Sequence, residues 1–259
     1  MPFYCTQGKI PPKRHTAFKK KDDRIFYEEL VSREGFSSMY SNLYHLQRPT
    51  KITQVGELVK HILSIAETKH RARHITTAKL NSTGDILSAR TPLFFNSDII
   101  ISVAAVSKSM DYCYRNGTAD EVLFVQNGKG KLISNLGTLD FKSGDYIIIP
   151  RGIIWQLAPE GAVKLLVIES AGAIETPNRY RNRFGQLLEH SPFCERDIQV
   201  PVLQDPITNK NECLVKVKTQ DEIQEYNYAH HPCDVVGWDG YYFPWSISIH
   251  DFEPIVGSI

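Results

Sequence analysis

Residues 144–152 read Gly-Asp-Tyr-Ile-Ile-Ile-Pro-Arg-Gly, and this stretch decides the fold. Gly144 permits a tight turn, and the β-branched residues that follow favour a strand. Pro150 ends the strand because it has no amide hydrogen to donate, and Gly152 permits a bend into the next strand. The stretch therefore predicts a strand held between two turns.

Similar apolar segments, separated by Gly, Asn, Pro or Ser, surround this stretch. Evenly spaced short strands of this kind are typical of a sandwich or barrel, with the jelly roll as one option. Asn127-Gly128 predicts a hairpin turn between its two neighbouring strands. The predicted strands are RHITTAKL (73–80), DIIISVAAV (98–106), EVLFVQ (121–126), GKLIS (130–134), DYIIIP (145–150) and VKLLVIE (163–169).

The spacing of Gly144, Pro150 and Gly152 resembles the second motif of the cupin superfamily, G-x5-P-x-G-x2-H-x3-N. The metal-ligand position of that motif falls on Trp155, and its final Asn falls on Pro159. An indole has no lone pair free to bind a metal, whereas divalent iron needs His and carboxylate donors. The resemblance therefore implies a cupin scaffold without its metal ligand at this position.

The first cupin motif, G-x5-H-x-H-x3,4-E-x6-G, can be laid over Glu121 and Gly128. Its two histidine positions then fall near Tyr114 and Asn116, or one residue later. We interpret the barrel as metal-free and Glu121 as a residue at a half-buried strand end.

The predicted fold is mainly β: a cupin or jelly-roll barrel with an N-terminal arm and one or two helices, followed by the start of a second β-barrel. Apolar residues spaced at helical intervals predict an amphipathic helix over 54–70, and a second, short helix is expected around Phe184–Leu188. The predicted divisions are 1–72 (arm and helix), 73–170 (metal-free cupin-like barrel), 171–200 (connector) and 201–259 (an incomplete second barrel).

The composition limits the classes of function. The 259 residues carry a net charge of +1, which offers no strong field to attract nucleic acid or an anionic membrane. There is no signal-peptide pattern or membrane-length apolar run, so we expect a cytoplasmic protein. The five cysteines are an odd number and contain no CxxC pair, which indicates free thiols in a reducing compartment.

The common catalytic motifs, including GxSxG, the P-loop, GxGxxG and HExxH, are absent from the sequence. His230-His231 is its only adjacent histidine pair. Neighbouring residues on a strand point to opposite faces, so this pair is not expected to bind one metal.

Several longer strings together resemble homogentisate 1,2-dioxygenases, most of all the shorter bacterial members of that family. The strings are PKRHTAF (12–18), FYEEL (26–30), EGFSSMYSNLYHLQRPT (34–50), HSPFCERDI (190–198) and DVVGWDGYYFPWSISIHDFEP (234–254). The resemblance implies two related β-barrels and a mononuclear Fe(II) that opens the ring of homogentisate with dioxygen. The product is maleylacetoacetate, in tyrosine and phenylalanine catabolism. The implied partners are the small aromatic substrate, dioxygen and further copies of the chain in trimers and hexamers, without nucleic acid or membrane.

The family holds its iron with two histidines and a glutamate in the C-terminal barrel, beyond the segment that matches residues 238–245. This sequence stops at Ile259, so no metal ligand can be carried over to it. We expect Fe(II) in the complete enzyme but none bound by this chain, which is expected to be a fragment that is inactive alone.

Many family members have Trp-His-Gly where this sequence has Trp238-Asp239-Gly240, and that His is assigned as the catalytic base. The resemblance makes Asp239 a candidate catalytic residue, although an Asp before Gly also commonly bonds its local backbone in a turn. Tyr242 is the candidate substrate-binding residue, while the other aromatic side chains of residues 238–245 are expected to pack as core.

Two other functions stay open. The chain could be a metal-free cupin module that binds or scaffolds partners without chemistry. It could also belong to a dioxygenase that acts on another hydroxylated aromatic acid, with Asp239 marking the changed specificity.

Overall fold

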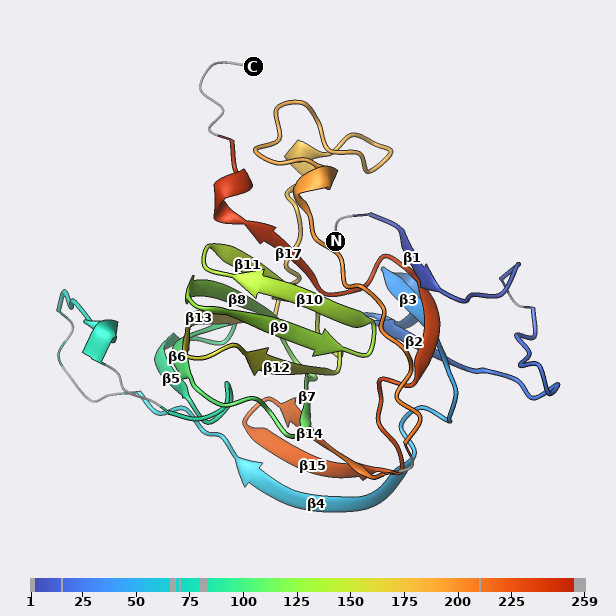
Figure 1. Ribbon diagram of the computed structural model, residues 1–259. Helices are drawn as coiled ribbons and strands as arrows, with labels where there is room; N and C mark the ends of the chain where they lie inside the picture. The colour runs from blue at the N-terminus through green and yellow to red at the C-terminus, as the bar shows by residue number, and fades with distance from the viewer. Residues whose placement is uncertain are drawn as a thin grey trace.

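A computed structural model describes residues 3–14, 16–65, 69, 71–79, 83–209 and 211–253. The described chain is built from three β-sheets and short 3-10 helices, with no α-helix among these residues (Figure 1). None of its helices is long and apolar enough to cross a membrane. The 3-10 helices are η1 (Gly35–Ser37), η2 (Thr77–Lys79), η3 (Asn178–Tyr180), η4 (Glu195–Asp197) and η5 (Ile249–Asp251).

The six-stranded sheet contains the stretch that decides the fold. Its order is β17-β11-β8-β13-β6-β5, and all of its pairings are antiparallel. Gly144 and Gly152 flank β11 with φ of +94° and +87°, as the predicted turns require. The strands are β5 (Arg90–Phe95), β6 (Ile99–Val106), β8 (Asp120–Asn127), β11 (Asp145–Ile149), β13 (Val163–Ser170) and β17 (Trp245–Ser248).

The seven-stranded sheet has the order β10-β9-β12-β7-β14-β15-β4. Its pairings are antiparallel except for β7 and β14, which run parallel. The strands are β4 (Ile52–Lys60), β7 (Cys113–Asn116), β9 (Lys129–Ser134), β10 (Gly137–Lys142), β12 (Trp155–Pro159), β14 (Cys213–Thr219) and β15 (Glu222–Tyr228).

A four-stranded sheet with the order β1-β16-β3-β2 joins the N-terminal arm to a late segment of the chain. Asp239 of β16 lies opposite Thr6 of β1 on one side and opposite Asn42 of β3 on the other. The strands are β1 (Cys5–Gly8), β2 (Tyr27–Ser32), β3 (Tyr40–His45) and β16 (Val235–Gly240).

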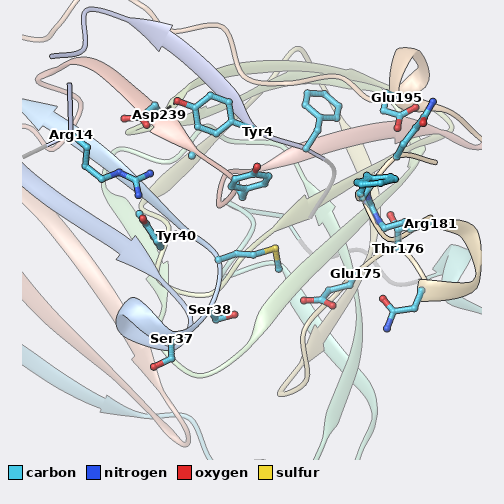
Figure 2. Close-up of a pocket in the computed structure, with 18 residues that line it drawn as sticks. Tyr4, Arg14, Ser37, Ser38, Tyr40, Glu175, Thr176, Arg181, Glu195 and Asp239 are labelled. Carbon is cyan, nitrogen blue, oxygen red and sulfur yellow. Dashed lines mark hydrogen bonds between the residues drawn. The ribbon is translucent and has the colours of Figure 1, made fainter. Parts of the chain in front are cut away.

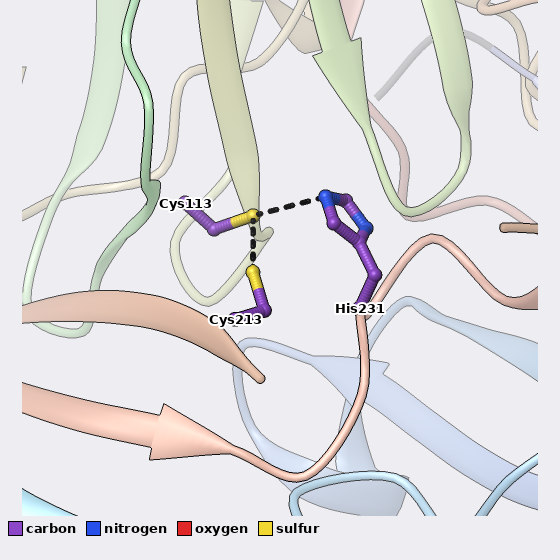
Figure 3. A group of neighbouring side chains, drawn as sticks. All are labelled: Cys113, Cys213 and His231. Atoms are coloured by element: carbon purple, nitrogen blue, oxygen red, sulfur yellow. Dashed lines mark hydrogen bonds between the residues drawn. The ribbon is translucent and has the colours of Figure 1, made fainter. Parts of the chain in front are cut away.

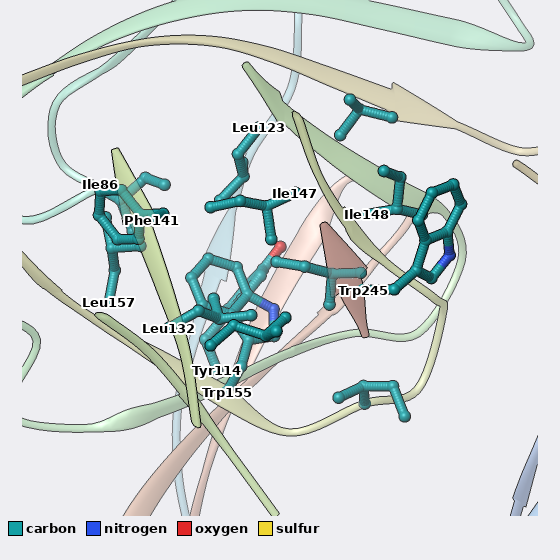
Figure 4. Close-up of a cluster of buried hydrophobic side chains, with 14 of the residues drawn as sticks. Ile86, Tyr114, Leu123, Leu132, Phe141, Ile147, Ile148, Trp155, Leu157 and Trp245 are labelled. Atoms are coloured by element: carbon teal, nitrogen blue, oxygen red, sulfur yellow. The ribbon is translucent and has the colours of Figure 1, made fainter. Parts of the chain in front are cut away.

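The main core lies between the two large sheets (Figure 4). Leu123 and Ile147 come from the six-stranded sheet, whereas Leu132 and Trp155 come from the seven-stranded sheet, and all four are buried. Alternating inward and outward residues along β9 and β13 produce this arrangement. The mainly-β prediction is confirmed, but the described strands form separate sheets that do not close into the predicted barrel.

The predicted helix over 54–70 is wrong. Residues Ile52–Lys60 form β4, the edge strand that pairs with β15, and residues 66–68 and 70 lie outside the described part of the chain. Val55, Leu58 and Val59, which suggested a buried helical stripe, are 50–60% exposed. Backbone pairing with β15 decided the structure here, because spacing alone cannot distinguish a helix from an edge strand with scattered apolar residues.

Three local predictions also change. β8 and β9 belong to different sheets, so the turn at Gly128 (φ +96°) carries the chain between sheets instead of closing a hairpin. The described residues of 73–80 contain η2 and no strand; Leu80 lies outside the description. The segment Phe184–Leu188 is a turn closed by a bridge between Arg181 and Leu187, not a helix.

The strands after residue 201 extend the sheets already described. β14 pairs with β7, β15 with β4, β16 with β1 and β3, and β17 with β11. These strands therefore do not start a barrel of their own. Their pairing brings Lys218 into the main sandwich and Asp239 against the N-terminal arm.

Candidate functional site

The structure gathers the residues that align with cupin metal ligands around a buried ionic network, which consists of Arg90, Glu121, Glu169 and Lys218. Arg90 Nη1 donates to Glu121 Oε1 at 2.7 Å and to Glu169 Oε1 at 3.1 Å. Lys218 Nζ donates to Glu169 Oε2 at 2.6 Å, and Asn116 Nδ2 donates to the same oxygen at 2.9 Å. Glu121 is 1% exposed, so it lies in the core and not at a half-buried strand end.

The two carboxylates of the ionic network differ in their electrostatics. Burial raises the pKa of Glu121, and the charge of Arg90 offsets only part of that effect. Burial also opposes ionisation of Glu169, but the charges of Arg90 and Lys218 outweigh it and lower the pKa of Glu169. Glu169 is therefore the fixed negative charge at the centre of the network.

The side chains at this position do not fit Fe(II). Trp155 packs edge-on against Tyr114, with ring centroids 5.3 Å apart and an interplanar angle of 88°. The Tyr114 hydroxyl, the Trp155 indole nitrogen and two guanidinium nitrogens of Arg90 are buried and have no hydrogen-bond partner among the described residues. These groups mainly donate hydrogen bonds, and two cationic side chains stand beside them, whereas iron requires several lone-pair donors.

Asp239 lies in a different place, in a surface pocket of ≈ 790 Å³ that we call the Asp239 pocket (Figure 2). β16 presents the Asp239 carboxylate, and the hydroxyl of Tyr4 donates to its Oδ2 at 3.0 Å. Burial and, after it, the charge of Asp239 raise the pKa of nearby Tyr44 to about 12. Asp239 is therefore a strand residue bonded across the sheet to the N-terminal arm, and not a turn residue bonded to its own backbone.

The Asp239 pocket combines aromatic rings with charges of both signs. The rings of Tyr4 and Tyr241 lie 5.5 Å apart and are 47% and 48% exposed. Arg14 lies over the Tyr40 ring at 5.8 Å. Burial lowers the pKa of Arg181, an effect that Glu195 and Glu175 oppose. The lining includes Phe3, Tyr4, Arg14, Tyr40, Glu175, Arg181, Phe184, Glu195, Asp239 and Tyr241.

Tyr242, the second residue singled out from the sequence, belongs to the core. It is 2% exposed, and its hydroxyl donates to the backbone oxygen of Arg151 at 2.7 Å. Its own amide donates to Ser41 Oγ at 2.9 Å. Tyr242 does not line the Asp239 pocket, and with its hydroxyl already bonded it is positioned to support β16 and β3 rather than to contact a ligand.

Sequence reasoning missed a cluster of Cys113, Cys213 and His231, whose ligand atoms lie within 4.8 Å of one another. All five cysteines have free thiols. His230 faces away from this cluster, with Nε2 2.8 Å from the backbone oxygen of Arg48. The adjacent histidines contact different partners, although they follow β15 and do not lie on a strand as the prediction assumed. One of them, His231, meets two cysteines far away in the sequence.

Known proteins place this chain in a family. The chain is 39% identical to a Saccharolobus solfataricus protein that is named as a dioxygenase without a stated substrate, over 100% of this chain and 67% of the relative. It is 27% identical to the homogentisate 1,2-dioxygenase of Bradyrhizobium diazoefficiens over 59% of this chain and 34% of the relative. The chain thus spans about two thirds of the first relative and about one third of the second.

Solved structures with similar parts include a cupin-2 domain protein from Shewanella frigidimarina, with a TM-score of 0.29 and 17% identity over 31% of this chain and 78% of that one. A Klebsiella pneumoniae protein with a double-stranded β-helix domain has a TM-score of 0.34 and 13% identity over 40% of this chain and 95% of that one. The family model described as "Homogentisate 1,2-dioxygenase N-terminal" matches residues 81–249. Because this match covers more than half of the sequence, the chain belongs to the homogentisate 1,2-dioxygenase N-terminal family.

Proposed function

We propose that this chain is part of a homogentisate 1,2-dioxygenase-like enzyme that cleaves the aromatic ring of homogentisate with dioxygen to give maleylacetoacetate, in tyrosine and phenylalanine catabolism. The observation that carries the proposal is the family match over residues 81–249. The Asp239 pocket supports it, because homogentisate has an apolar ring, phenolic hydroxyls and a carboxylate, and the pocket offers aromatic rings, a carboxylate and an arginine.

The Asp239 pocket can hold such a molecule as follows. The exposed rings of Tyr4 and Tyr241 provide a surface for the substrate ring. Arg14 is placed to pair with the substrate carboxylate. The Asp239 carboxylate then accepts a hydrogen bond from a phenolic hydroxyl in place of Tyr4, and it can take that proton as a general base.

Ring cleavage by this family also needs Fe(II), which supplies the site where dioxygen is activated. Among the described residues, the group with metal-ligand spacing is the cysteine–histidine cluster, whose soft donors do not match the His and carboxylate ligands of non-haem iron. We therefore propose that the catalytic iron is held by residues outside the described part of this chain, and that the chain alone does not catalyse the reaction. On the family resemblance, we also propose that the working enzyme is a cytoplasmic homo-oligomer.

Ligand binding to the purified chain tests the role of the Asp239 pocket. Calorimetric titration with homogentisate should show one site, and Arg14→Met and Asp239→Asn should each weaken it about tenfold, because each removes a charge-assisted contact. Asp140→Asn is the matched control, since Asp140 is an exposed carboxylate on β10 outside the pocket. Equal affinity in all four proteins would reject the pocket as the substrate surface.

Oxygen uptake tests the reaction itself. The chain alone with Fe(II) and homogentisate should consume no dioxygen, whereas the chain completed with the unmatched third of the Saccharolobus relative should consume it and form maleylacetoacetate. Gentisate and 2-hydroxyphenylacetate, offered to the completed protein, separate homogentisate from other hydroxylated aromatic acids. Homogentisate-dependent uptake by the chain alone would contradict the proposed division of labour.

A further inference from the structure

The side chains of Cys113, Cys213 and His231 point toward one another (Figure 3). The two cysteines belong to a small apolar core, apart from the main sandwich core. Cys113 begins β7 and Cys213 begins β14, and these two strands are parallel neighbours. His231 lies just after β15. The surrounding side chains are Ile154, Val215, Val217, Tyr226 and Tyr228. Three segments that are distant in sequence thus bring their sulfur and nitrogen atoms into one largely water-excluded place.

The spacing of these atoms is close to that of a tetrahedral metal site. Cys113 Sγ lies 3.6 Å from Cys213 Sγ and 3.9 Å from His231 Nε2. Metal bonds of about 2.3 Å to sulfur and about 2.0 Å to nitrogen, at tetrahedral angles, place two sulfurs about 3.8 Å apart and a sulfur and a nitrogen about 3.6 Å apart. Both of these distances are within a few tenths of an ångström of the tetrahedral values, and the third pair, Cys213 and His231, has its ligand atoms within 4.8 Å of each other. Rotation of the side chains that draws Cys213 and His231 together would let all three bind one ion.

The donor types select the metal. Two thiolates and one imidazole are a soft to borderline set that suits Zn(II), whereas Fe(II) in oxygenases takes two histidines and a carboxylate, and Mg(II) takes oxygen ligands. Zinc also binds such ligands more tightly than iron does. The site differs in its donor chemistry from the iron centre of the proposed reaction, and it does not depend on that reaction.

We propose that Cys113, Cys213 and His231 form a zinc site that joins β7, β14 and the segment between β15 and β16. The fourth ligand is a water or the thiol of Cys233, two residues after His231. Because the ligands lie 100 and 18 residues apart in the sequence, the site forms only in the folded chain, and zinc binding therefore stabilises the folded state.

One hydrogen bond must change when zinc binds. The Cys233 amide donates to His231 Nδ1 at 3.1 Å, so the ring hydrogen of the metal-free chain is on Nε2, facing Cys113. Zinc on Nε2 displaces that hydrogen to Nδ1, which then cannot accept from the Cys233 amide. The amide resonance of Cys233 is therefore a local reporter of zinc coordination at the imidazole.

The test starts from the reduced full chain stripped of metal with a chelator. Zinc should bind at one equivalent, raise Tm, and shift the Cys233 amide resonance. Cobalt(II) in place of zinc should give the thiolate-to-cobalt charge-transfer bands and intense visible bands of a tetrahedral site.

Cys113→Ser and Cys213→Ser should each abolish zinc binding and the thiolate-to-cobalt charge-transfer bands. His231→Gln should weaken zinc binding about tenfold or more. Cys5→Ser and Cys194→Ser are the controls, because these thiols lie outside the cluster. Cys233→Ser weakens binding if its thiol is the fourth ligand and leaves it unchanged if a water is. Two results would overturn the proposal. One is the absence of the cobalt charge-transfer bands in the reduced wild-type chain, which does not depend on the folding of any variant. The other is zinc binding that survives in the double variant Cys113→Ser and Cys213→Ser.

Discussion

The ionic network and the Asp239 pocket both collect charged side chains, but they treat those charges in opposite ways. In the network, Arg90, Glu121, Glu169 and Lys218 are buried and bond to one another. In the pocket, carboxylates and arginines stand beside half-exposed rings around a cavity. Buried charges that bond to one another are costly to separate, whereas charges displayed around a cavity are available to a ligand. The place where the cupin metal-ligand motif aligns with this chain therefore holds a structural ionic network.

Breaking the ionic network should have the largest effect. Arg90→Met leaves Glu121 and Glu169 buried without their shared cation, and should lower the free energy of unfolding by about 3–5 kcal/mol. Denaturant unfolding measures this change. Lys129→Met, which breaks the exposed Lys129–Glu160 pair, is the control and should cost under about 1 kcal/mol. Similar values for both variants would show that the network does not differ from a surface ion pair.

A second buried charge is that of His45 on β3, the strand that pairs with β16. His45 Nδ1 is 2.6 Å from Asp234 Oδ1 and its Nε2 is 3.1 Å from Glu29 Oε2. Burial lowers the pKa of His45, but the hydrogen bonds to Asp234 and Glu29 outweigh burial and raise it from 6.5 to about 9. Because the folded-state pKa is the higher one, this stabilisation is complete below pH 6.5 and is lost as the pH rises through about 9.

The loss should amount to about 3 kcal/mol between these two pH values. Unfolding measured across this range should show a falling free energy in the wild-type chain and a flatter profile in His45→Gln. A profile equally steep in the variant would mean that another group titrates.

Tyr242→Phe should have a moderate effect. It removes the hydroxyl that donates to the Arg151 backbone oxygen and leaves the ring in place, so the free energy of unfolding should fall by about 1 kcal/mol. Homogentisate affinity should stay the same, because Tyr242 does not line the Asp239 pocket. Weaker ligand binding with unchanged stability would return Tyr242 to the substrate site.

Asp239→Asn should affect stability least. The carboxylate is only partly buried, and the amide oxygen of Asn can still accept from Tyr4, so the free energy of unfolding should change by under about 0.5 kcal/mol. In calorimetric titration the same variant should lose about tenfold in homogentisate affinity. A large loss of stability with intact binding would place Asp239 with the structural charges.

Local signals in the sequence were sufficient to predict strand β11 and to identify the motif positions Tyr114 and Trp155, which lie side by side. Gly144 and Pro150 bracket β11 as predicted, and Trp155 pairs with Tyr114 across β12 and β7. The cationic residues of the ionic network, Arg90 and Lys218, lie on β5 and β14. Neither lies in a local sequence pattern that predicts its contact with the network.

Two other features that the sequence did not predict, strand β4 and the cysteine–histidine cluster, have the same cause. β4 took its structure from pairing with β15, over 160 residues later, and Cys113 meets Cys213 only because β7 and β14 are neighbours. Periodicity and spacing describe what a segment can do alone, whereas strand order decides which segments meet.

An NMR titration of the labelled chain with homogentisate tests most directly the claim that the Asp239 pocket, and not the cupin interior, is the ligand surface. We expect saturable shifts at Tyr4, Tyr40 and Tyr241, with Tyr114 and the Trp155 indole unchanged. Shifts centred on Tyr114 and Trp155, with the pocket residues unmoved, would contradict it.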